Sequence, residues 1–377
     1  MRILYVTDAL AIWGGLERIL VDKVNLLADL YGYDMYLVTL NQGSHPIPYP
    51  LSSKVTHEDI NIQSHQQYQY KGVKRLLRMI QLHQLFRSRI RQKIQAIQPD
   101  VIVCSRRQLV GVVAKTKGDI PLVVESHTLC NAEKIEKTSF FRKMHMCKVK
   151  RRIRNADVLV ALTDGDANDW RRINQNVFVI PNVVYLNENT SFSTCNSKSI
   201  IFVGRLSKQK NISVLLDIWK KVNLANPDWV LHIYGEKGDI EDCVFDRLLM
   251  AKNIGIVIHE PVRKQMIEEY KKHSILVLTS IFEPFGLVLP EAMSCGLPVV
   301  SFDCPYGPAD IITDGVDGFL IKNRDVNEFA DRVCQLIEDR ELRARMGQTA
   351  VKSSKRYRAD LIMPKWKELF ERLCQKE

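Results

Sequence analysis

Short apolar runs alternate with longer helical patterns through the first half of the chain. The runs of strand length are RILYVT, DMYLVTL, DVIVCS, PLVVES and ADVLVALT. Amphipathic stretches separate them, including one that begins at about Gly15 and a long one near 74–97. Strands that alternate with helices predict a parallel sheet with crossover helices.

The second half repeats this arrangement with the runs SIIFVG, WVLHIYG, GIVIHE, ILVLTS and PVVSFD. A polar stretch with little periodicity, including Pro181 and Asn182, lies between the halves. A chain of 377 residues is also long for a single core. We therefore predict an α/β protein of two doubly wound Rossmann-like domains that face a central cleft, with domains at 1–180 and 199–360 and a linker at 181–198.

Composition narrows the class of protein. Apolar residues make up 46% and charged residues 26% of the chain, and no apolar run is long enough to cross a bilayer. The first ten residues are read as a buried strand rather than a secretory leader. The nine cysteines are scattered without the spacing of a zinc site or a disulfide framework, which favours reduced thiols in the cytoplasm.

Two motifs follow strands, where open α/β sheets bind their ligands. The segment GRLSKQKN places Arg205 and Lys210 just after the strand SIIFV. Two cations at a strand end suit a diphosphate, although a solvated basic loop would show the same residues.

The segment EPFGLVLPE follows the strand ILVLTS and carries Glu283 and Glu291. Its glycine turn would free backbone N–H groups at a helix start for an anion. We place Glu291 about two turns into that helix, beyond the first turn in which the helix dipole favours acids. Helix capping therefore does not explain why an acid stands at position 291. The alternative is that its carboxylate accepts hydrogen bonds from ligand hydroxyls, such as those of a ribose diol.

Together these motifs resemble the retaining glycosyltransferases of family 4, which have the two-Rossmann GT-B fold. The resemblance covers essentially the whole chain, and it rests on Gly14-Gly15, Gly204-Arg205-Leu206 with Lys210, and Glu283-x7-Glu291 followed by EAMSCGLPVVSFD. It also implies a C-terminal helix at 361–377 that packs back on the N-terminal domain.

The resemblance implies a role for each motif residue. Arg205 and Lys210 would bind the donor pyrophosphate, Glu291 the donor ribose, and Glu283 would lie near the transferred sugar. The substrate would also meet Gly14, Gly15 and the amides of Phe285, Gly286 and Leu287. No cofactor and no metal is implied, because the two cations can stabilise the leaving diphosphate.

His127, in VVESHT at a strand end, matches the active-site histidine of the family. A single histidine at a strand end is more often structural, so this role depends on the resemblance. The chain departs from the family pattern at Asn211 and Pro284, where many relatives carry glycine. The segment TDGD, with Asp164 and Asp166, looks like a metal-binding motif but follows a strand and starts a helix, which favours capping.

Positive charge is concentrated in one half of the chain. Residues 1–180 contain 27 Lys and Arg against 16 Asp and Glu, whereas residues 181–377 contain 27 of each. The stretches 71–93 and 142–154 contain no acid. An apolar stripe in the first (Leu76, Leu77, Ile80, Leu85, Phe86, Ile90, Ile94) predicts a helix buried against the sheet.

This basic half predicts an anionic partner that the other half does not share. The second stretch, with aromatic residues beside its cations, suits an anionic membrane surface or a phosphate-bearing acceptor, although a solvated basic face is the alternative. We expect a cytoplasmic protein with peripheral contact at the inner face of the membrane.

We predict a retaining enzyme that moves a hexose or N-acetylhexosamine from a nucleoside diphosphate sugar, UDP-linked, to a glycan or polyprenyl-diphosphate-linked glycan in surface polysaccharide synthesis. One alternative is a sugar-nucleotide epimerase of the same fold. Another is a non-enzymatic anion-binding protein, for instance of nucleic acid. No recognised nucleic-acid motif is present, so we expect no nucleic-acid partner.

Overall fold

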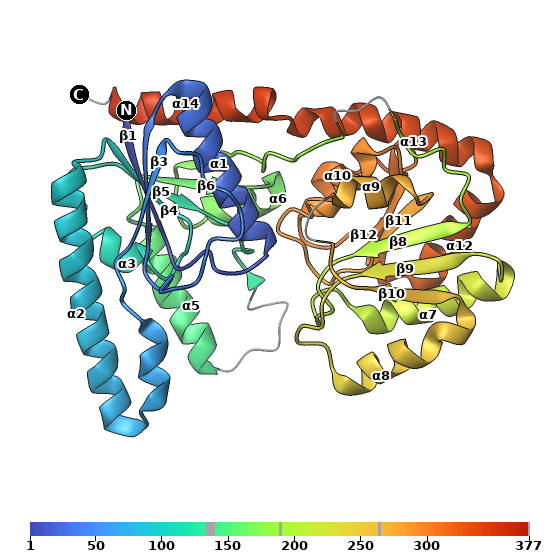
Figure 1. Cartoon of the computed structure of the whole chain (residues 1–377), viewed down its shortest axis with the longest axis horizontal. Helices are drawn as coiled ribbons and strands as arrows, with labels where there is room; N and C mark the ends of the chain where they lie inside the picture. The colour runs from blue at the N-terminus through green and yellow to red at the C-terminus, as the bar shows by residue number, and fades with distance from the viewer. Residues whose placement is uncertain (133–139, 188–190, 263–264, 376–377) are drawn as a thin grey trace. The chain divides into compact units, whose positions relative to one another are not determined.

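The computed structural model describes residues 1–132, 140–187, 191–262 and 265–375. The chain divides into two compact units, each with its own sheet (Figure 1). Unit 1 comprises Met1–Val183 and Ala359–Glu377, and unit 2 comprises Val184–Arg358. The C-terminal helix therefore belongs to the unit that contains the N-terminus.

Unit 1 is an α/β unit. Its elements are β1 (Arg2–Thr7), α1 (Gly15–Tyr31), β2 (Asp34–Thr39), β3 (Val55–Asp59), η1 (Ser64–Gln69), α2 (Gly72–Ile97), β4 (Val101–Cys104), α3 (Val110–Val113), β5 (Leu122–Glu125), α5 (Phe140–Ile153), β6 (Val158–Ala161), α6 (Asp164–Arg171), β7 (Val177–Val179) and α14 (Ala359–Cys374). The sheet order is β3-β2-β1-β4-β5-β6-β7, and all strands pair in parallel. The predicted doubly wound arrangement is confirmed.

Strand β1 shows how side chains on alternate faces bury the sheet on both sides. Leu4 and Val6 belong to the core that includes Phe86 of α2. Ile3 and Tyr5 point the other way, because successive side chains of a strand face opposite sides. Their core includes residues of α1 and Trp366 of α14, so α14 covers the same face of the sheet as α1.

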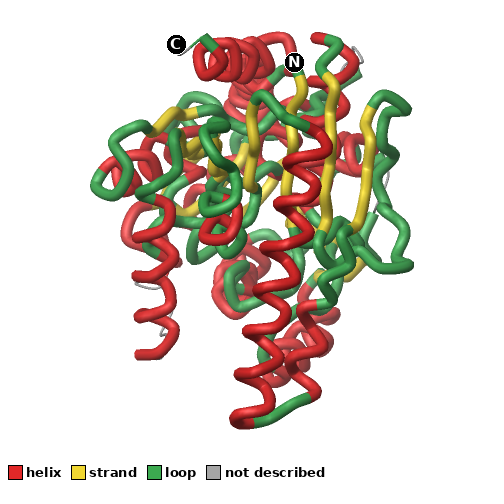
Figure 2. Tube along the Cα trace, turned by 90° about the vertical axis from the view of Figure 1, so that its left-hand side faces the viewer, coloured by secondary structure: helices red, strands yellow, loops and turns green. Residues whose placement is uncertain are grey.

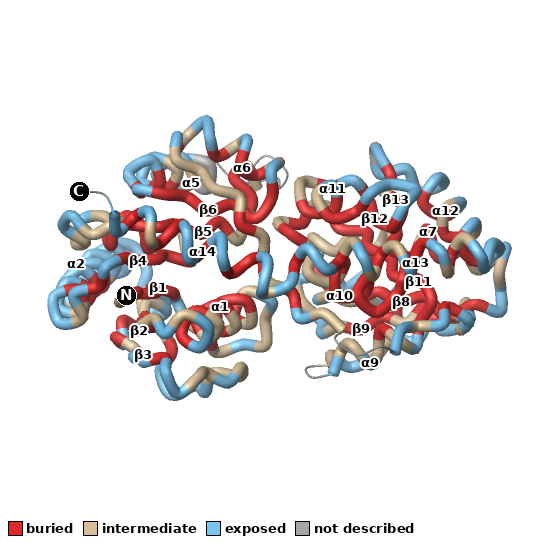
Figure 3. The backbone as a smooth tube through the Cα atoms, turned by 90° about the horizontal axis from the view of Figure 1, so that it is seen from above, coloured by how far each residue is buried: buried red, intermediate tan, exposed pale blue. Residues whose placement is uncertain are grey.

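Helix α2 is buried over only part of its length. Leu82, Phe86, Ile90 and Ile94 are buried as part of the core. The predicted burial of Leu76, Leu77 and Ile80 is wrong, because these side chains are exposed. Figure 2 shows the helix extending beyond the ends of the strands, and Figure 3 shows its exposed residues in pale blue.

Unit 2 repeats the architecture. Its elements are β8 (Ser199–Val203), α7 (Ile212–Ala225), β9 (Val230–Tyr234), α8 (Asp242–Met250), η2 (Ala251–Ile254), β10 (Ile256–His259), α9 (Met266–Lys271), β11 (Ile275–Leu278), α10 (Val288–Ser294), β12 (Val299–Phe302), α11 (Gly307–Ile311), β13 (Gly318–Ile321), η3 (Lys322–Arg324), α12 (Val326–Glu338), α13 (Arg340–Ser354) and η4 (Lys355–Tyr357).

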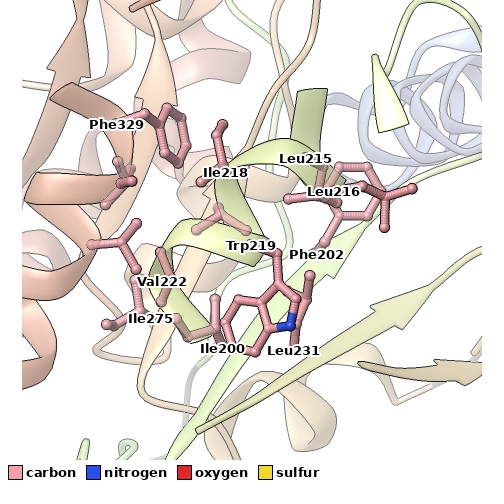
Figure 4. Close-up of a cluster of buried hydrophobic side chains, with 14 of the residues drawn as sticks. Ile200, Phe202, Leu215, Leu216, Ile218, Trp219, Val222, Leu231, Ile275 and Phe329 are labelled. Carbon is pink, nitrogen blue, oxygen red and sulfur yellow. The ribbon is translucent and has the colours of Figure 1, made fainter. Parts of the chain in front are cut away.

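The sheet of unit 2 runs β10-β9-β8-β11-β12-β13, with every pairing parallel. The strand order therefore reverses between β8 and β11, and ligands of such sheets bind at that point. Helix α7 packs Leu215, Ile218 and Trp219 into the core, as Figure 4 shows. Within the described residues, no helix is both long enough and apolar enough to cross a bilayer.

Candidate functional site

The loops that follow β8 and β11 are bonded to each other at the switch point of unit 2. Gln209 donates its side-chain amide to the carbonyl of Phe282 at 2.9 Å, and its own carbonyl accepts from the amide of Ile281 at 2.8 Å. Thr279 Oγ1 donates to the carbonyl of Lys210 at 2.9 Å. These contacts bring the two predicted motifs together as one site.

Lys210 and Glu283 form a salt bridge at the centre of this site. Their side chains are only 15% and 7% exposed, and Ser280 Oγ donates to the same carboxylate oxygen at 2.7 Å. Glu283 is also fixed through its backbone, because its amide donates to the carbonyl of Pro305 at 2.7 Å and its carbonyl accepts from the amide of Gly307 at 2.8 Å. An ammonium has three donors, so Lys210 can hold Glu283 and an anion together.

Arg205 lies beside this pair in sequence but has a different partner. Its guanidinium donates to Glu236 at 3.1 Å, and both side chains are about half exposed, at 49% and 45%. The stem of Arg205 rests against Gly238, where an added Cβ would lie 2.7 Å from its Cγ and Cδ. An exposed ion pair is weak, so the Arg205 guanidinium can leave Glu236 for a ligand at low cost.

Glu291 does not lie where the sequence analysis placed it. Helix α10 begins only at Val288, so Glu291 falls in its first turn and the prediction of a position two turns in is wrong. Gly286 delays the helix start, because its φ of 92° lies in the left-handed region and outside the helical one. First-turn placement makes a favourable contact with the helix dipole a further explanation for this acid.

Glu291 is nevertheless buried and directed by a neighbouring helix. The residue is 5% exposed, and Tyr270 of α9 donates its hydroxyl to Oε2 at 3.2 Å. Phe285 is buried with its ring edge-on to Tyr357 at 5.3 Å, which anchors the loop between Glu283 and Glu291. Leu287 precedes the first helical residue.

The backbone conformation of Asn211 shows how asparagine can stand where many relatives carry glycine. Its backbone adopts φ 55° and ψ 50°, the left-handed conformation that glycine adopts most easily. Asparagine is among the non-glycine residues that tolerate this region best. The substitution therefore keeps the turn that ends the Arg205–Lys210 loop.

In unit 1, Gly14 and Gly15 form the junction between the loop after β1 and helix α1. Gly14 is the N-cap and Gly15 the first helical residue. Tyr49 donates its hydroxyl to the carbonyl of Gly14 at 3.2 Å. A Cβ at Gly14 would lie 2.1 Å from Glu17 Oε2, and Glu17 is itself buried and paired with Arg106 at 3.2 Å.

His127 is held by a buried network at the end of β5. Its Nε2 lies 2.7 Å from Glu125 Oε2, while Glu125 Oε1 contacts Lys23 Nζ at 2.9 Å and accepts from Tyr5 Oη at 3.0 Å. The Lys23 ammonium also lies 4.3 Å from the ring centroid of Trp366 in α14. The network thus joins β1, α1, β5 and the C-terminal helix.

The charges in this network fix the tautomer of His127. Burial would raise the pKa of Glu125, but Lys23 and the hydrogen bond to His127 outweigh it and lower that pKa to about 2. Burial lowers the pKa of His127 despite the opposing effect of Glu125. A carboxylate only accepts, so the neutral imidazole must donate from Nε2 and carry its lone pair on Nδ1.

That Nδ1 atom is buried and has no hydrogen-bond partner among the described residues. Buried polar atoms are normally satisfied, so Nδ1 is a place where a ligand hydroxyl could donate. The sequence analysis missed Glu125 and Lys23. Glu125 could have been noticed as an acid two residues before a strand-end histidine, but Lys23 carries no local signal.

The capping predicted for TDGD is made by Thr163, and its acid Asp166 has other partners. Thr163 caps α6, and its Oγ1 accepts from the amide of Asp166. The Asp166 carboxylate accepts from the amide of Cys130 at 2.8 Å and from Trp170 Nε1 at 3.0 Å. Among residues 1–132, 140–187, 191–262 and 265–375, no cluster of His, Cys, Asp and Glu is arranged to hold a metal ion.

Comparisons with known proteins match both halves of the chain. The model for glycosyltransferase family 4 matches residues 13–188, and the model for glycosyl transferases group 1 matches residues 189–353. The two matches are contiguous, and each contains one of the sites described above. The amylovoran biosynthesis glycosyltransferase AmsD of Erwinia amylovora is 27% identical over 98% of this chain and 99% of its own.

The chain is a glycosyltransferase of the GT-B fold. A second relative, the poly(ribitol-phosphate) α-N-acetylglucosaminyltransferase of Staphylococcus aureus, is 32% identical over 52% of this glycosyltransferase and 40% of its own length. Among solved structures, S. aureus TarM with UDP and a glycan ligand has a TM-score of 0.78 at 16% identity, covering 98% of this chain and 99% of that chain. Anabaena HepE with UDP-glucose has a TM-score of 0.74 at 20% identity, covering 99% of this chain and 100% of that chain.

Proposed function

We propose that this glycosyltransferase moves a hexose or N-acetylhexosamine from a UDP-linked donor to a glycan acceptor, with retention of configuration, in surface polysaccharide synthesis. The observation that carries the proposal is the largely buried Lys210–Glu283 pair at the switch point of the sheet. Arg205 lies in the same loop as Lys210. Its relatives include an enzyme of amylovoran biosynthesis and an N-acetylglucosaminyltransferase.

The donor diphosphate binds the ends of β8 and β11. Lys210 donates to it while keeping Glu283 as a partner, and Arg205 exchanges Glu236 for a phosphate oxygen. The amides of Phe285, Gly286 and Leu287 donate to phosphate and sugar oxygens. Glu291, held by Tyr270, accepts from the ribose hydroxyls.

In unit 1, His127 and the Gly14-Gly15 turn contribute the other substrate contacts. The Nδ1 lone pair of His127 accepts from a hydroxyl of the donor sugar, because Glu125 holds the proton on Nε2. A side chain at Gly14 would displace the Glu17 carboxylate, whose Oε2 would lie 2.1 Å from an added Cβ.

Transfer takes place at one face of the sugar. The bond between the anomeric carbon and the diphosphate oxygen breaks, and the acceptor oxygen bonds to that carbon on the same face. The acceptor proton passes to the leaving diphosphate. Arg205 and Lys210 stabilise the negative charge that grows on the diphosphate, so no metal ion is required.

The acceptor is an anionic or lipid-linked glycan, most simply a polyprenyl-diphosphate-linked one, which unit 1 binds at an anionic membrane. The excess of positive charge in residues 1–180 supports this part of the proposal. Helix α5 carries Lys148, Arg151 and Arg152 on its exposed side. The side chains of Phe140 and Phe141, which first suggested a membrane contact, lie outside the described residues.

The test incubates the protein with UDP-, GDP- and ADP-sugars in the presence of EDTA. Release of the nucleoside diphosphate is the readout. We expect release from a UDP-sugar only, and NMR of the product should show the anomeric configuration of the donor. Inversion, or a requirement for Mg²⁺ or Mn²⁺, would contradict the mechanism. An epimerised donor without transfer would instead indicate an epimerase.

A further inference from the structure

Helix α2 presents an apolar stripe to solvent over its first turns. Val73, Leu76, Leu77 and Ile80 are 73%, 56%, 54% and 47% exposed. They lie at i, i+3, i+4 and i+7, the spacing that places side chains on one face of a helix. Exposed large apolar side chains in one contiguous stripe mark an interaction surface.

The stripe precedes the part of α2 that packs on the sheet. Its four residues all lie before Leu82, the first buried residue of α2, which at ~100° per residue lies half a turn around the helix from Val73. The short helix η1 also packs on another side, where Arg75 lies 4.8 Å from the ring centroid of Tyr68 and Arg78 donates to Gln66 at 2.6 Å. The fold of unit 1 therefore already supports α2 without using the stripe.

The charge around the stripe identifies its partner. Residues 60–99 contain no Asp or Glu, whereas residues 71–93 contain eight Lys and Arg. Lys71 and Lys74 are exposed at the same end of the helix as the stripe. A second copy of the chain would bring like charges together, whereas an anionic surface with an apolar interior complements both features.

We propose that the first turns of α2 are a membrane-docking surface, in which Val73, Leu76, Leu77 and Ile80 insert into an anionic bilayer between flanking cations. The inference rests on the membrane-borne acceptor of the proposed function and names the surface that reaches it. Helix α5 is a poorer candidate for insertion, because Val149 and Ile153 are buried and Met144 is the one exposed large apolar side chain among its described residues.

A matched pair of triple variants tests this proposal. Leu76→Asp, Leu77→Asp and Ile80→Asp together place three acids in the stripe. Leu30→Asp, Leu224→Asp and Leu361→Asp make the same change in charge at leucines that are 55%, 88% and 51% exposed elsewhere. All sites are exposed, so both variants should keep the melting temperature of the wild type.

Co-sedimentation with phosphatidylglycerol vesicles is the readout, with phosphatidylcholine vesicles for comparison. We expect the wild type to bind phosphatidylglycerol vesicles, the control variant to bind within ~2-fold of it, and the α2 variant to bind at least ~10-fold more weakly. Equal binding by the α2 variant, no binding by the wild type, or self-association that the α2 variant abolishes would each overturn the proposal. Donor hydrolysis without vesicles is measured in parallel, so failure of the proposed function is recognised separately.

A tryptophan reporter tests insertion itself. Leu77→Trp lies in the stripe, whereas Gln95→Trp lies at an exposed position ~27 Å further along the same helix. Brominated lipids should quench the added emission of Leu77→Trp and leave that of Gln95→Trp unchanged. Equal quenching at both positions, or none at either, would contradict insertion through the stripe.

Discussion

Glu125 Oε2 lies 2.7 Å from Nε2 of His127, and this contact sets which imidazole nitrogen carries the lone pair as an acceptor. The carboxylate is buried, ionised and compensated by Lys23 on α1. The same lysine lies against Trp366 of the C-terminal helix. The chain's last helix therefore supports the residue that we place beside the donor sugar.

Glu125→Gln should impair turnover more than donor binding. The amide of glutamine can donate to Nε2, which would move the imidazole proton to Nδ1 and remove the acceptor there. We expect kcat to fall at least ~10-fold while the Kd for UDP changes little. NMR of the imidazole nitrogens should show the change of tautomer, and an unchanged tautomer with unchanged kcat would refute the assignment.

Lys23→Met should destabilise unit 1, because it leaves the Glu125 carboxylate buried without its cation. Breaking a buried ion pair costs about 3–5 kcal/mol. The double variant Lys23→Met, Glu125→Gln should recover part of that loss, since no buried charge remains unpaired. Urea unfolding of the three variants measures the coupling, and strictly additive losses would argue against a buried pair.

The fold was predictable because its strands are nearly continuous apolar runs, as in parallel sheets covered on both faces. The strands β3, β7 and β13 were not predicted, since VTHED has a single apolar residue, VFV is very short and GFLI follows a turn-rich loop. The exposure of Leu76, Leu77 and Ile80 could not be predicted, because periodicity shows which side chains share a face but not what covers that face. Lys23 was invisible for a similar reason, since its partner lies 102 positions away.

Substitution of Glu291 and substitution of Glu283 should change different kinetic parameters. Glu291→Ala removes a contact that we propose is made equally in the ground and transition states, so it should raise KM and leave kcat nearly unchanged. Tyr270→Phe, which frees the Glu291 carboxylate from its hydroxyl, should change KM in the same direction by less. Glu283→Gln should mainly lower kcat. If calorimetry shows that Glu291→Ala binds UDP as tightly as the wild type, Glu291 does not bind the donor ribose.

Unit 2 should lose stability in mild acid through His273. Burial, together with the nearby His232 imidazole, lowers the pKa of His273 to about 3, against about 6.5 in the unfolded chain. Between these values the unfolded state binds the extra proton, so the free energy of unfolding falls as the pH falls, by up to ~1.4 kcal/mol per pH unit. His273→Gln should show a shallower decline from pH 6.5 downward in denaturant titrations. An equal slope in both proteins would show that His273 does not contribute.

Nucleotide binding to Lys210→Ala, with Lys208→Ala as the control, tests the central claim most directly. Both lysines lie in the loop after β8, but Lys208 is 62% exposed and pairs with Glu241 on the surface, whereas Lys210 is nearly buried against Glu283. Isothermal titration with UDP should show binding by the wild type, binding within ~2-fold by Lys208→Ala, and a loss of ~10-fold or more for Lys210→Ala, the size expected for a hydrogen bond to a charged group. Wild-type affinity in a folded Lys210→Ala variant, or no binding of UDP by the wild type, would contradict the account.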